Sequence, residues 1–215
     1  DLGVHAVRGL LDRTGLPRDA VDAVVWGGVV LPSASPNVGR EIGLELGLPP
    51  SVQAFTVSRA CSSGLEAVTQ AVSLVERGEA DVVIAGGGDS TSNAEVKLAQ
   101  KLVYATAPLA LGKKAGVRDY LGIVPQLFPL REILPRRPRI AERSTGELMG
   151  EAAESMGQRN HIARADQDAF AVRSHHRAAR ARADGVFDEE ITPVTVGDVT
   201  VHEDGMVRAD TSVEK

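Results

Sequence analysis

The sequence contains a single cysteine, Cys61, and aromatic residues make up only 3% of its 215 residues. One cysteine excludes an internal disulfide and a cysteine metal cluster, and the scarcity of aromatics predicts an aliphatic core. A basic excess is also lacking: the formal net charge is −5, which excludes nucleic acid as an expected partner. No apolar run approaches the ~20 residues that span a bilayer. We therefore expect a cytoplasmic protein.

The first ninety residues show an alternation of strands and helices. Short apolar runs predict three buried strands over residues 23–30, 52–57 and 81–85. Between the last two runs, large apolar side chains recur at the spacing of one helix face. These side chains are Leu65, Val68, Val72 and Val75. Strand, helix and strand joined by short links indicate a parallel α/β sheet.

After Gly88 the pattern changes. Residues 93–104 look helical, and residues 105–140 lack a steady period, which is typical of an insertion. Ser144 and Glu147 have capping-box spacing and predict a helix up to residue 159. A longer helix is expected over residues 164–183, followed by two short strands within 190–205. Residues 211–214 again have capping-box spacing, and we interpret residues 211–215 as the start of a truncated helix.

Cys61 stands where an apolar strand ends and a helix begins. The first turn of a helix offers unpaired N–H groups and the positive end of the helix dipole. Both stabilise a thiolate, and the same N–H groups can hold an oxyanion. The small neighbours Ser62, Ser63 and Gly64 let a substrate approach. The position therefore favours an acyl-accepting nucleophile, although a lone cysteine is more often a small buried hydrophobe.

A cysteine nucleophile usually needs a base, and the histidines of this sequence are poor candidates. None of them lies in a glycine-rich turn, and we interpret all as structural or surface residues. They are His5, His161, His175, His176 and His202. We expect His175 and His176 on a solvated helix face and the base outside this sequence.

Five stretches, in this order, resemble the thiolase family of 3-ketoacyl-CoA thiolases and acetyl-CoA acetyltransferases. They are SRACSSGLEAV, GEADVVIAGGGDSTS, TGELMGEAAE, ARADQDAFAVRSHHRAARARADGVFDEEITPV and VRADTSVEK. The resemblance covers nearly the whole chain and is weakest over residues 105–140. It points in particular to the thiolase subunit of fatty-acid-oxidation complexes.

The resemblance implies an α/β fold: a thiolase-like N-terminal half, layered αβα with a mostly parallel sheet, and an inserted, mostly helical loop domain. On this basis residues 1–92 form the N-terminal half without its opening strand. Residues 93–210 form the loop domain, and residues 211–215 begin a helix that returns to the core. The second half of the family fold is expected to be missing, and the chain alone to be inactive.

Three residues match functional positions of the family. Cys61 matches the nucleophile that accepts the acyl group. Met149 matches a loop-domain residue that contacts coenzyme A near its pantetheine, and Arg208 matches an arginine at the nucleotide end of coenzyme A. Without the resemblance, Met149 would be read as a helix-packing residue and Arg208 as half of a surface ion pair.

Two positions depart from the family pattern. Ser58 stands where the family usually has Asn, three residues before the nucleophile. We expect Ser58 to make the same local turn hydrogen bond more weakly. Leu148 replaces a histidine of many relatives, which changes the polarity expected of the pocket.

The resemblance implies an acyl-CoA:acetyl-CoA C-acyltransferase. It would cleave 3-ketoacyl-CoA by thiolysis, or run the reverse Claisen condensation, through an acyl group on Cys61. Coenzyme A would be a substrate, with no permanently bound cofactor and no metal. A ketosynthase-type condensing enzyme and a non-catalytic thiolase-fold subunit that binds lipid or a partner remain alternatives. The expected partners are acyl-CoA and coenzyme A, a homodimer or tetramer, and a hydratase/dehydrogenase subunit of a β-oxidation complex.

Overall fold

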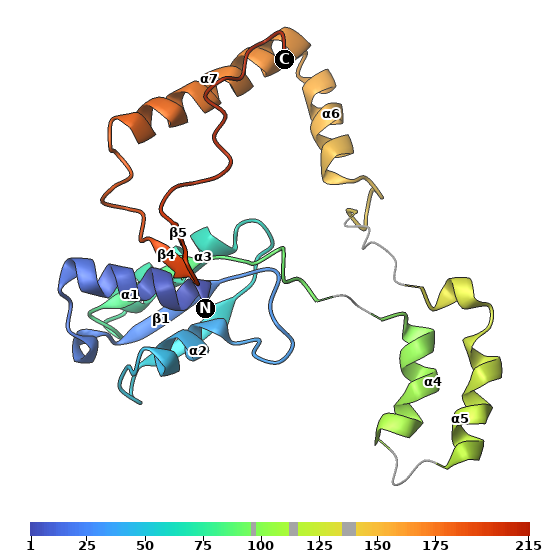
Figure 1. Cartoon of the computed structure of the whole chain (residues 1–215). Coiled ribbons are helices and arrows are strands. Elements are labelled where there is room, and N and C mark those ends of the chain that lie inside the picture. Colours follow the sequence, from blue (N-terminus) through green and yellow to red (C-terminus); the bar gives the residue numbers. More distant parts are fainter. Residues whose placement is uncertain (96–97, 112–115, 135–140) are drawn as a thin grey trace. The chain divides into compact units, whose positions relative to one another are not determined.

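A computed structural model of the chain describes residues 1–95, 98–111, 116–134 and 141–215 (Figure 1). Part of the insertion expected over residues 105–140 lies outside the described residues. Asp1–Ala94 and Phe170–Lys215 form one compact unit, and Glu95–Ala169 form a second. The division into residues 1–92, 93–210 and 211–215 stays a prediction.

The first unit is built on a three-stranded sheet of order β2-β1-β3 in which both pairs of strands are parallel. The strands are β1 (Ala23–Gly27), β2 (Gln53–Val57) and β3 (Val83–Gly87). Every residue of β1 is buried because this strand has a neighbour on each edge and helices on both faces. The predicted strand–helix–strand unit and its parallel sheet are confirmed.

Alternate residues of β1 point into two separate cores. Val24 and Trp26 pack on one face with α1 (Leu2–Thr14) and α2 (Val38–Glu45). Ala23 and Val25 pack on the other face with α3 (Ser63–Glu76). The two-residue period of a strand therefore produces an αβα layering from one continuous apolar run.

Two carboxylates tie β1 to β3, one at each end. Asp22 accepts hydrogen bonds from two consecutive backbone N–H groups just before β3, including that of Val82 at 2.9 Å. These bonds, with Val82 contributing most, lower the pKa of Asp22. Beyond the other end, Asp89 accepts from the N–H groups of Val29 (2.9 Å) and Val30 (2.8 Å).

Helix α3 is apolar on two sides. Its sheet-facing side consists of the buried residues Ala67, Ala71 and Leu74. The large apolar stripe expected from the sequence lies on the exposed side instead: Leu65 (71% exposed), Val68, Val72 and Val75. The sheet receives the small side chains because they allow the helix to approach the strands closely.

The C-terminal part of the first unit contains a short antiparallel hairpin. It consists of β4 (Val194–Val196) and β5 (Val199–Val201), as predicted, and follows α7 (Arg164–Ala183), whose residues belong to both units. Thr192, just before β4, accepts a hydrogen bond from Arg13 of α1 at 3.0 Å. The expected helix start at residues 211–215 is seen as a turn in which the Lys215 N–H donates to Ser212 O.

The second unit is helical, and its helices start later than the sequence suggested. They are α4 (Gln100–Leu111), α5 (Val117–Ile123) and α6 (Met149–Arg159), with short 3-10 segments at Val124–Leu127 and Leu130–Glu132. The predicted capping box at Ser144 and Glu147 is wrong, because α6 begins at Met149 and the Glu151 carboxylate accepts the N–H of Leu148 at 2.7 Å. No described helix is long and apolar enough to cross a membrane.

Replacing both Leu65 and Val72 by Gln should change the free energy of unfolding of the chain by no more than about 0.5 kcal/mol, because both side chains are already exposed. The contrasting variant Leu74→Ala, on the buried side of the same helix, should cost about 2–5 kcal/mol. Urea unfolding followed by circular dichroism measures both. A large loss of unfolding free energy in the double Gln variant would show that these side chains are covered and not exposed.

Candidate active site

Cys61 lies in the turn that joins β2 to α3, at the carboxyl edge of the parallel sheet. Strand β2 ends at Val57 and α3 begins at Ser63, with Ser62 as its N-cap residue. The cysteine side chain is exposed. Ligands of open α/β sheets bind at this edge, so the thiol stands where a substrate can reach it.

The residue before Cys61 has an unusual backbone conformation. Ala60 has φ of 46°, in the left-handed region that non-glycine residues rarely occupy. Two backbone hydrogen bonds close the turn around it: Ser62 N–H donates to Arg59 O and Ser63 N–H donates to Ala60 O, both at 3.1 Å. Such a conformation persists only where the surrounding structure holds it.

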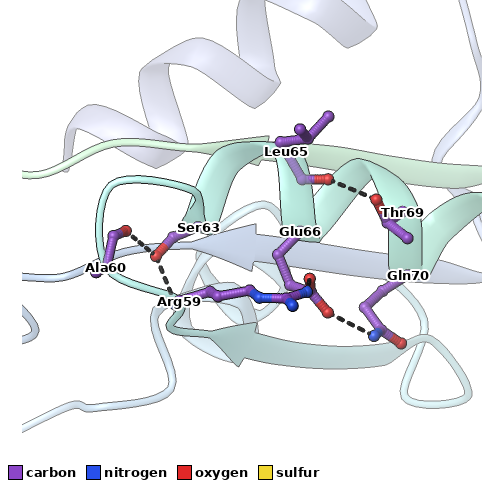
Figure 2. Close-up of polar contacts among 7 residues, drawn as sticks. All are labelled: Arg59, Ala60, Ser63, Leu65, Glu66, Thr69 and Gln70. Atoms are coloured by element: carbon purple, nitrogen blue, oxygen red, sulfur yellow. Dashed lines mark hydrogen bonds and ion pairs between the residues drawn. The ribbon is translucent and has the colours of Figure 1, made fainter.

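The Ser63 side chain supplies further contacts that hold this turn. The residue is 4% exposed, and its hydroxyl accepts the N–H of Arg59 at 2.8 Å and donates to Ala60 O at 2.6 Å. Figure 2 shows this hydroxyl placed between the two residues. The hydroxyl therefore spans the backbone segment immediately before Cys61 and uses both its donor and an acceptor position there.

An ion pair connects the turn to the body of α3. Arg59 Nη1 lies 2.5 Å from Glu66 Oε2, and Gln70 Nε2 donates to Glu66 Oε1 at 2.8 Å (Figure 2). The hydrogen bonds from Gln70 and Arg59 lower the pKa of Glu66. The Arg59 side chain is 72% exposed, so this pair orients the turn more than it stabilises the fold.

Glycines at the strand ends allow the start of α3 to approach the sheet. A Cβ on Gly27 would lie 2.3 Å from the carbonyl oxygen of Ser63, and a Cβ on Gly87 would lie 2.6 Å from Gly27 O. Any other residue at Gly27 would push the helix away.

Arg208 lies against helix α7. Its backbone N–H donates to His175 Nδ1 at 3.2 Å, and its guanidinium Nη2 lies 3.3 Å from His175 Nε2. A neutral imidazole accepts through only one of its two nitrogens, so the tautomer of His175 decides which of these two contacts is a hydrogen bond. His175 therefore lies against both the backbone and the guanidinium of Arg208.

The adjacent histidine holds the same C-terminal segment. His176 Nε2 lies 2.9 Å from Thr211 O. The expected solvated face is confirmed for His176, which is exposed, while His175 is half-buried; both rings also contact a segment more than thirty residues away. No periodicity along α7 could have revealed this pairing.

The three residues predicted to act on substrate are not joined to one another. Met149 is the first residue of α6, is 68% exposed and belongs to the second unit, whereas Cys61 and Arg208 belong to the first. In the described part of the chain, no hydrogen bond or ion pair links any two of them. Nor do the described residues contain a group of three or more His, Cys, Asp and Glu side chains that could hold a metal ion.

Ser63 is the site residue that sequence reasoning missed. We expected Ser58 to make the local hydrogen bond of the nucleophile turn, but the hydroxyl that does so belongs to Ser63. The available signal was a small polar residue in the first helical turn after Cys61, where side chains often bond to nearby backbone. Leu148, the second departure, is the N-cap residue of α6.

Fold and site define a parallel α/β protein with one cysteine presented at a helix start. The sequence matches the family described as "Thiolase, N-terminal domain" over residues 1–215, and the chain belongs to the thiolase family. It is 37% identical to a 3-ketoacyl-CoA thiolase of Pseudoalteromonas translucida over 216 residues, covering 100% of this chain and 49% of that protein. It is 39% identical to one of Aliivibrio fischeri over 191 residues, covering 89% and 42%.

Solved structures give the same fold. A crystal structure of human mitochondrial 3-ketoacyl-CoA thiolase in complex with CoA superimposes with a TM-score of 0.77 at 23% identity, over 98% of this chain and 49% of that one. The acetyl-CoA acetyltransferase of Bacillus anthracis superimposes with a TM-score of 0.75 at 26% identity, over 98% and 50%. The chain thus spans about half the length of the proteins it matches, and the thiolase-like fold is confirmed.

Replacing Gly27 by Ala should destabilise the chain by roughly 1–3 kcal/mol, because the added methyl group meets the Ser63 carbonyl. Gly64→Ala is the matched control: nothing lies within 4 Å of its Cβ position, and Ala should stabilise the helix by about 0.5–1 kcal/mol. Urea unfolding measures both variants. Equal stability of Gly27→Ala and the unmodified chain would contradict the close approach.

Proposed function

We propose that the whole protein is a thiolase that transfers acyl groups between Cys61 and coenzyme A. One observation carries the proposal: a thiolase-family chain presents its single cysteine, exposed, on a hydrogen-bonded turn at the carboxyl edge of the sheet. Relatives at 37–39% identity bear the name 3-ketoacyl-CoA thiolase, which supports a 3-ketoacyl-CoA substrate.

The proposed reaction has two half-reactions. The Cys61 thiolate bonds to the C3 carbonyl carbon of 3-ketoacyl-CoA, and the C2–C3 bond breaks. Its electron pair stays on C2, which takes a proton and leaves as acetyl-CoA. The coenzyme A thiol, after losing its proton, then attacks the thioester on Cys61, releasing the shortened acyl-CoA and the free thiolate. The reverse sequence is a Claisen condensation.

The described chain supplies part of this chemistry. The N–H groups of Ser62 and Ser63 donate within the turn, so we assign the oxyanion contact to the N–H of Cys61 itself. Each oxyanion donor is worth about 10²–10³ in rate and general acid–base help about 10²–10⁴. The described histidine contacts go to the C-terminal segment, so we propose that the 215-residue chain alone does not turn over substrate.

Coenzyme A is proposed as a substrate, with no resident cofactor or metal. Arg208 contacts its nucleotide end and Met149 its pantetheine. The guanidinium of Arg208 has five N–H donors, and one described contact, to His175, leaves donors for a phosphate. Met149 presents an exposed thioether at the start of α6, a soft apolar surface suited to a pantetheine chain.

We also propose a cytoplasmic homodimer or tetramer that associates with a hydratase/dehydrogenase subunit of a β-oxidation complex. Two features support burial of the first unit against further protein. Strand β2 is at an edge of the sheet, where unpaired backbone groups favour pairing. The exposed stripe of α3 is a contiguous set of large apolar side chains, which the remainder of a protein twice this length can cover.

Incubating the whole protein with acetoacetyl-CoA, without free coenzyme A, should leave one acetyl group on the peptide containing Cys61, detected by mass spectrometry. Cys61→Ser should abolish this adduct and lower thiolysis on the order of 10⁴-fold or more, because the acyl acceptor is lost. Unchanged turnover in Cys61→Ser would exclude the acyl-cysteine route. A wild-type protein with neither adduct nor turnover would instead support the non-catalytic subunit.

Replacing Arg208 by Ala should raise KM for coenzyme A roughly tenfold, since a hydrogen bond to a charged group is worth about 1.5–3 kcal/mol, and leave kcat nearly unchanged. With a pantetheine thiol that lacks the nucleotide, the variant should match the wild type. Arg177→Ala, an exposed position on the same helix as His175, is the control. An equal effect with both thiols would contradict the nucleotide contact.

A further inference from the structure

We propose that Ser63 is the positioning residue of the nucleophile, and that its hydroxyl holds Ala60 in the left-handed conformation that sets the direction of Cys61. This inference rests on the proposed function, because it assigns Ser63 a role in presenting the thiol that accepts the acyl group. Ser63 itself does not touch substrate in this assignment, since its hydroxyl is occupied by two backbone groups.

The turn before Cys61 has a conformational cost. A positive φ at alanine is unfavourable without a partner that compensates for it. The backbone bonds from Ser62 and Ser63 close the turn at 3.1 Å, but the shorter contacts are those of the Ser63 hydroxyl, at 2.8 Å to Arg59 N and 2.6 Å to Ala60 O. The hydroxyl thus binds both ends of the Arg59–Ala60 segment.

The Ser63 hydroxyl differs from the Arg59 side chain of the same turn because Ser63 is buried and Arg59 is exposed. Ser63 is 4% exposed, and the carbonyl of the same residue packs against the Gly27 backbone position. Arg59, by contrast, is 72% exposed, so water competes with its ion pair. The Ser63 backbone packs against the end of β1, and the Ser63 hydroxyl binds the backbone of Arg59 and Ala60. Through these contacts the position of β1 fixes the position of the turn that carries Cys61.

The test compares three variants of the whole protein. Ser63→Ala removes the hydroxyl. Thr69→Ala is the matched control, because the Thr69 hydroxyl lies on the same helix and donates only to Leu65 O, one turn back (Figure 2). The double variant Ala60→Gly with Ser63→Ala asks whether glycine, which adopts positive φ without strain, replaces the function of the hydroxyl.

Ser63→Ala should lower kcat for acetoacetyl-CoA thiolysis at least about tenfold, the effect of one lost hydrogen bond to a group that must stay oriented. KM for coenzyme A should stay within about twofold, because positioning the thiol acts on the chemical step. The double variant should recover at least about threefold of the loss. Thr69→Ala should match the wild type in both constants.

Ala60→Val provides a second route if Ser63→Ala does not fold. Ala60 is exposed, so valine fits sterically, but a β-branched residue strongly disfavours positive φ. This variant should lower kcat at least about fivefold, and the backbone strain should lower the melting temperature by roughly a few degrees without preventing folding. A kcat within twofold of wild type in Ser63→Ala or, where that variant does not fold, in Ala60→Val would overturn the proposal.

Alkylation of Cys61 by iodoacetamide separates this inference from the proposed function. The reaction needs no thiolase activity, and its rate against pH reports the thiol in its turn. A wild-type protein without turnover would refute the thiolase proposal, and the alkylation profiles would still decide the role of Ser63. The proposal is supported if the alkylation rate against pH differs between the wild type and Ser63→Ala while Thr69→Ala matches the wild type. It is overturned if the profiles of the wild type and Ser63→Ala superimpose.

Discussion

The close approach of the first turn of α3 to the end of β1 at Gly27 is the constraint on which the position of the Cys61 turn depends. The absence of a side chain at Gly27 lets the Ser63 carbonyl come against the strand, and the small residues Ala67 and Ala71 continue the same close packing along the helix. Once the helix is fixed in this way, the residues just before it must turn sharply. Cys61 is presented at the edge of the sheet as a consequence.

The outward side of the same helix is a large apolar surface that the described residues leave exposed. Ala67, Ala71 and Leu74 face the sheet and a stripe of larger apolar side chains faces outward, so α3 is apolar on two sides. An exposed contiguous apolar stripe commonly marks a surface that contacts further protein. This arrangement accords with a chain that spans about half the length of its relatives, and it explains how an apolar stripe can be real in the sequence and exposed in the structure.

Much of the fold followed from local patterns. Apolar runs located β1, β2 and β3, because burial of a strand on both faces leaves a continuous apolar run. The helix period located α3 although the stripe that shows this period is exposed in the described chain. Errors arose where local patterns compete. The capping-box spacing at Ser144 and Glu147 is satisfied by chance, whereas Glu151 accepts the N–H at the actual helix start. A motif of two residues cannot distinguish these alternatives.

The sequence by itself determined that one cysteine stands between a buried strand and a helix, because that statement concerns neighbours along the chain. Only the tertiary structure decided which side of α3 packs on the sheet, that Ser63 rather than Ser58 binds the nucleophile turn, and that His175 and His176 hold the segment from Arg208 to Thr211. The His175 and His176 contacts join residues 33 and 35 positions apart, which no period along the chain relates. The Ser63 contacts span only three and four residues, but they depend on the backbone conformation of the turn at Ala60, which the sequence does not specify.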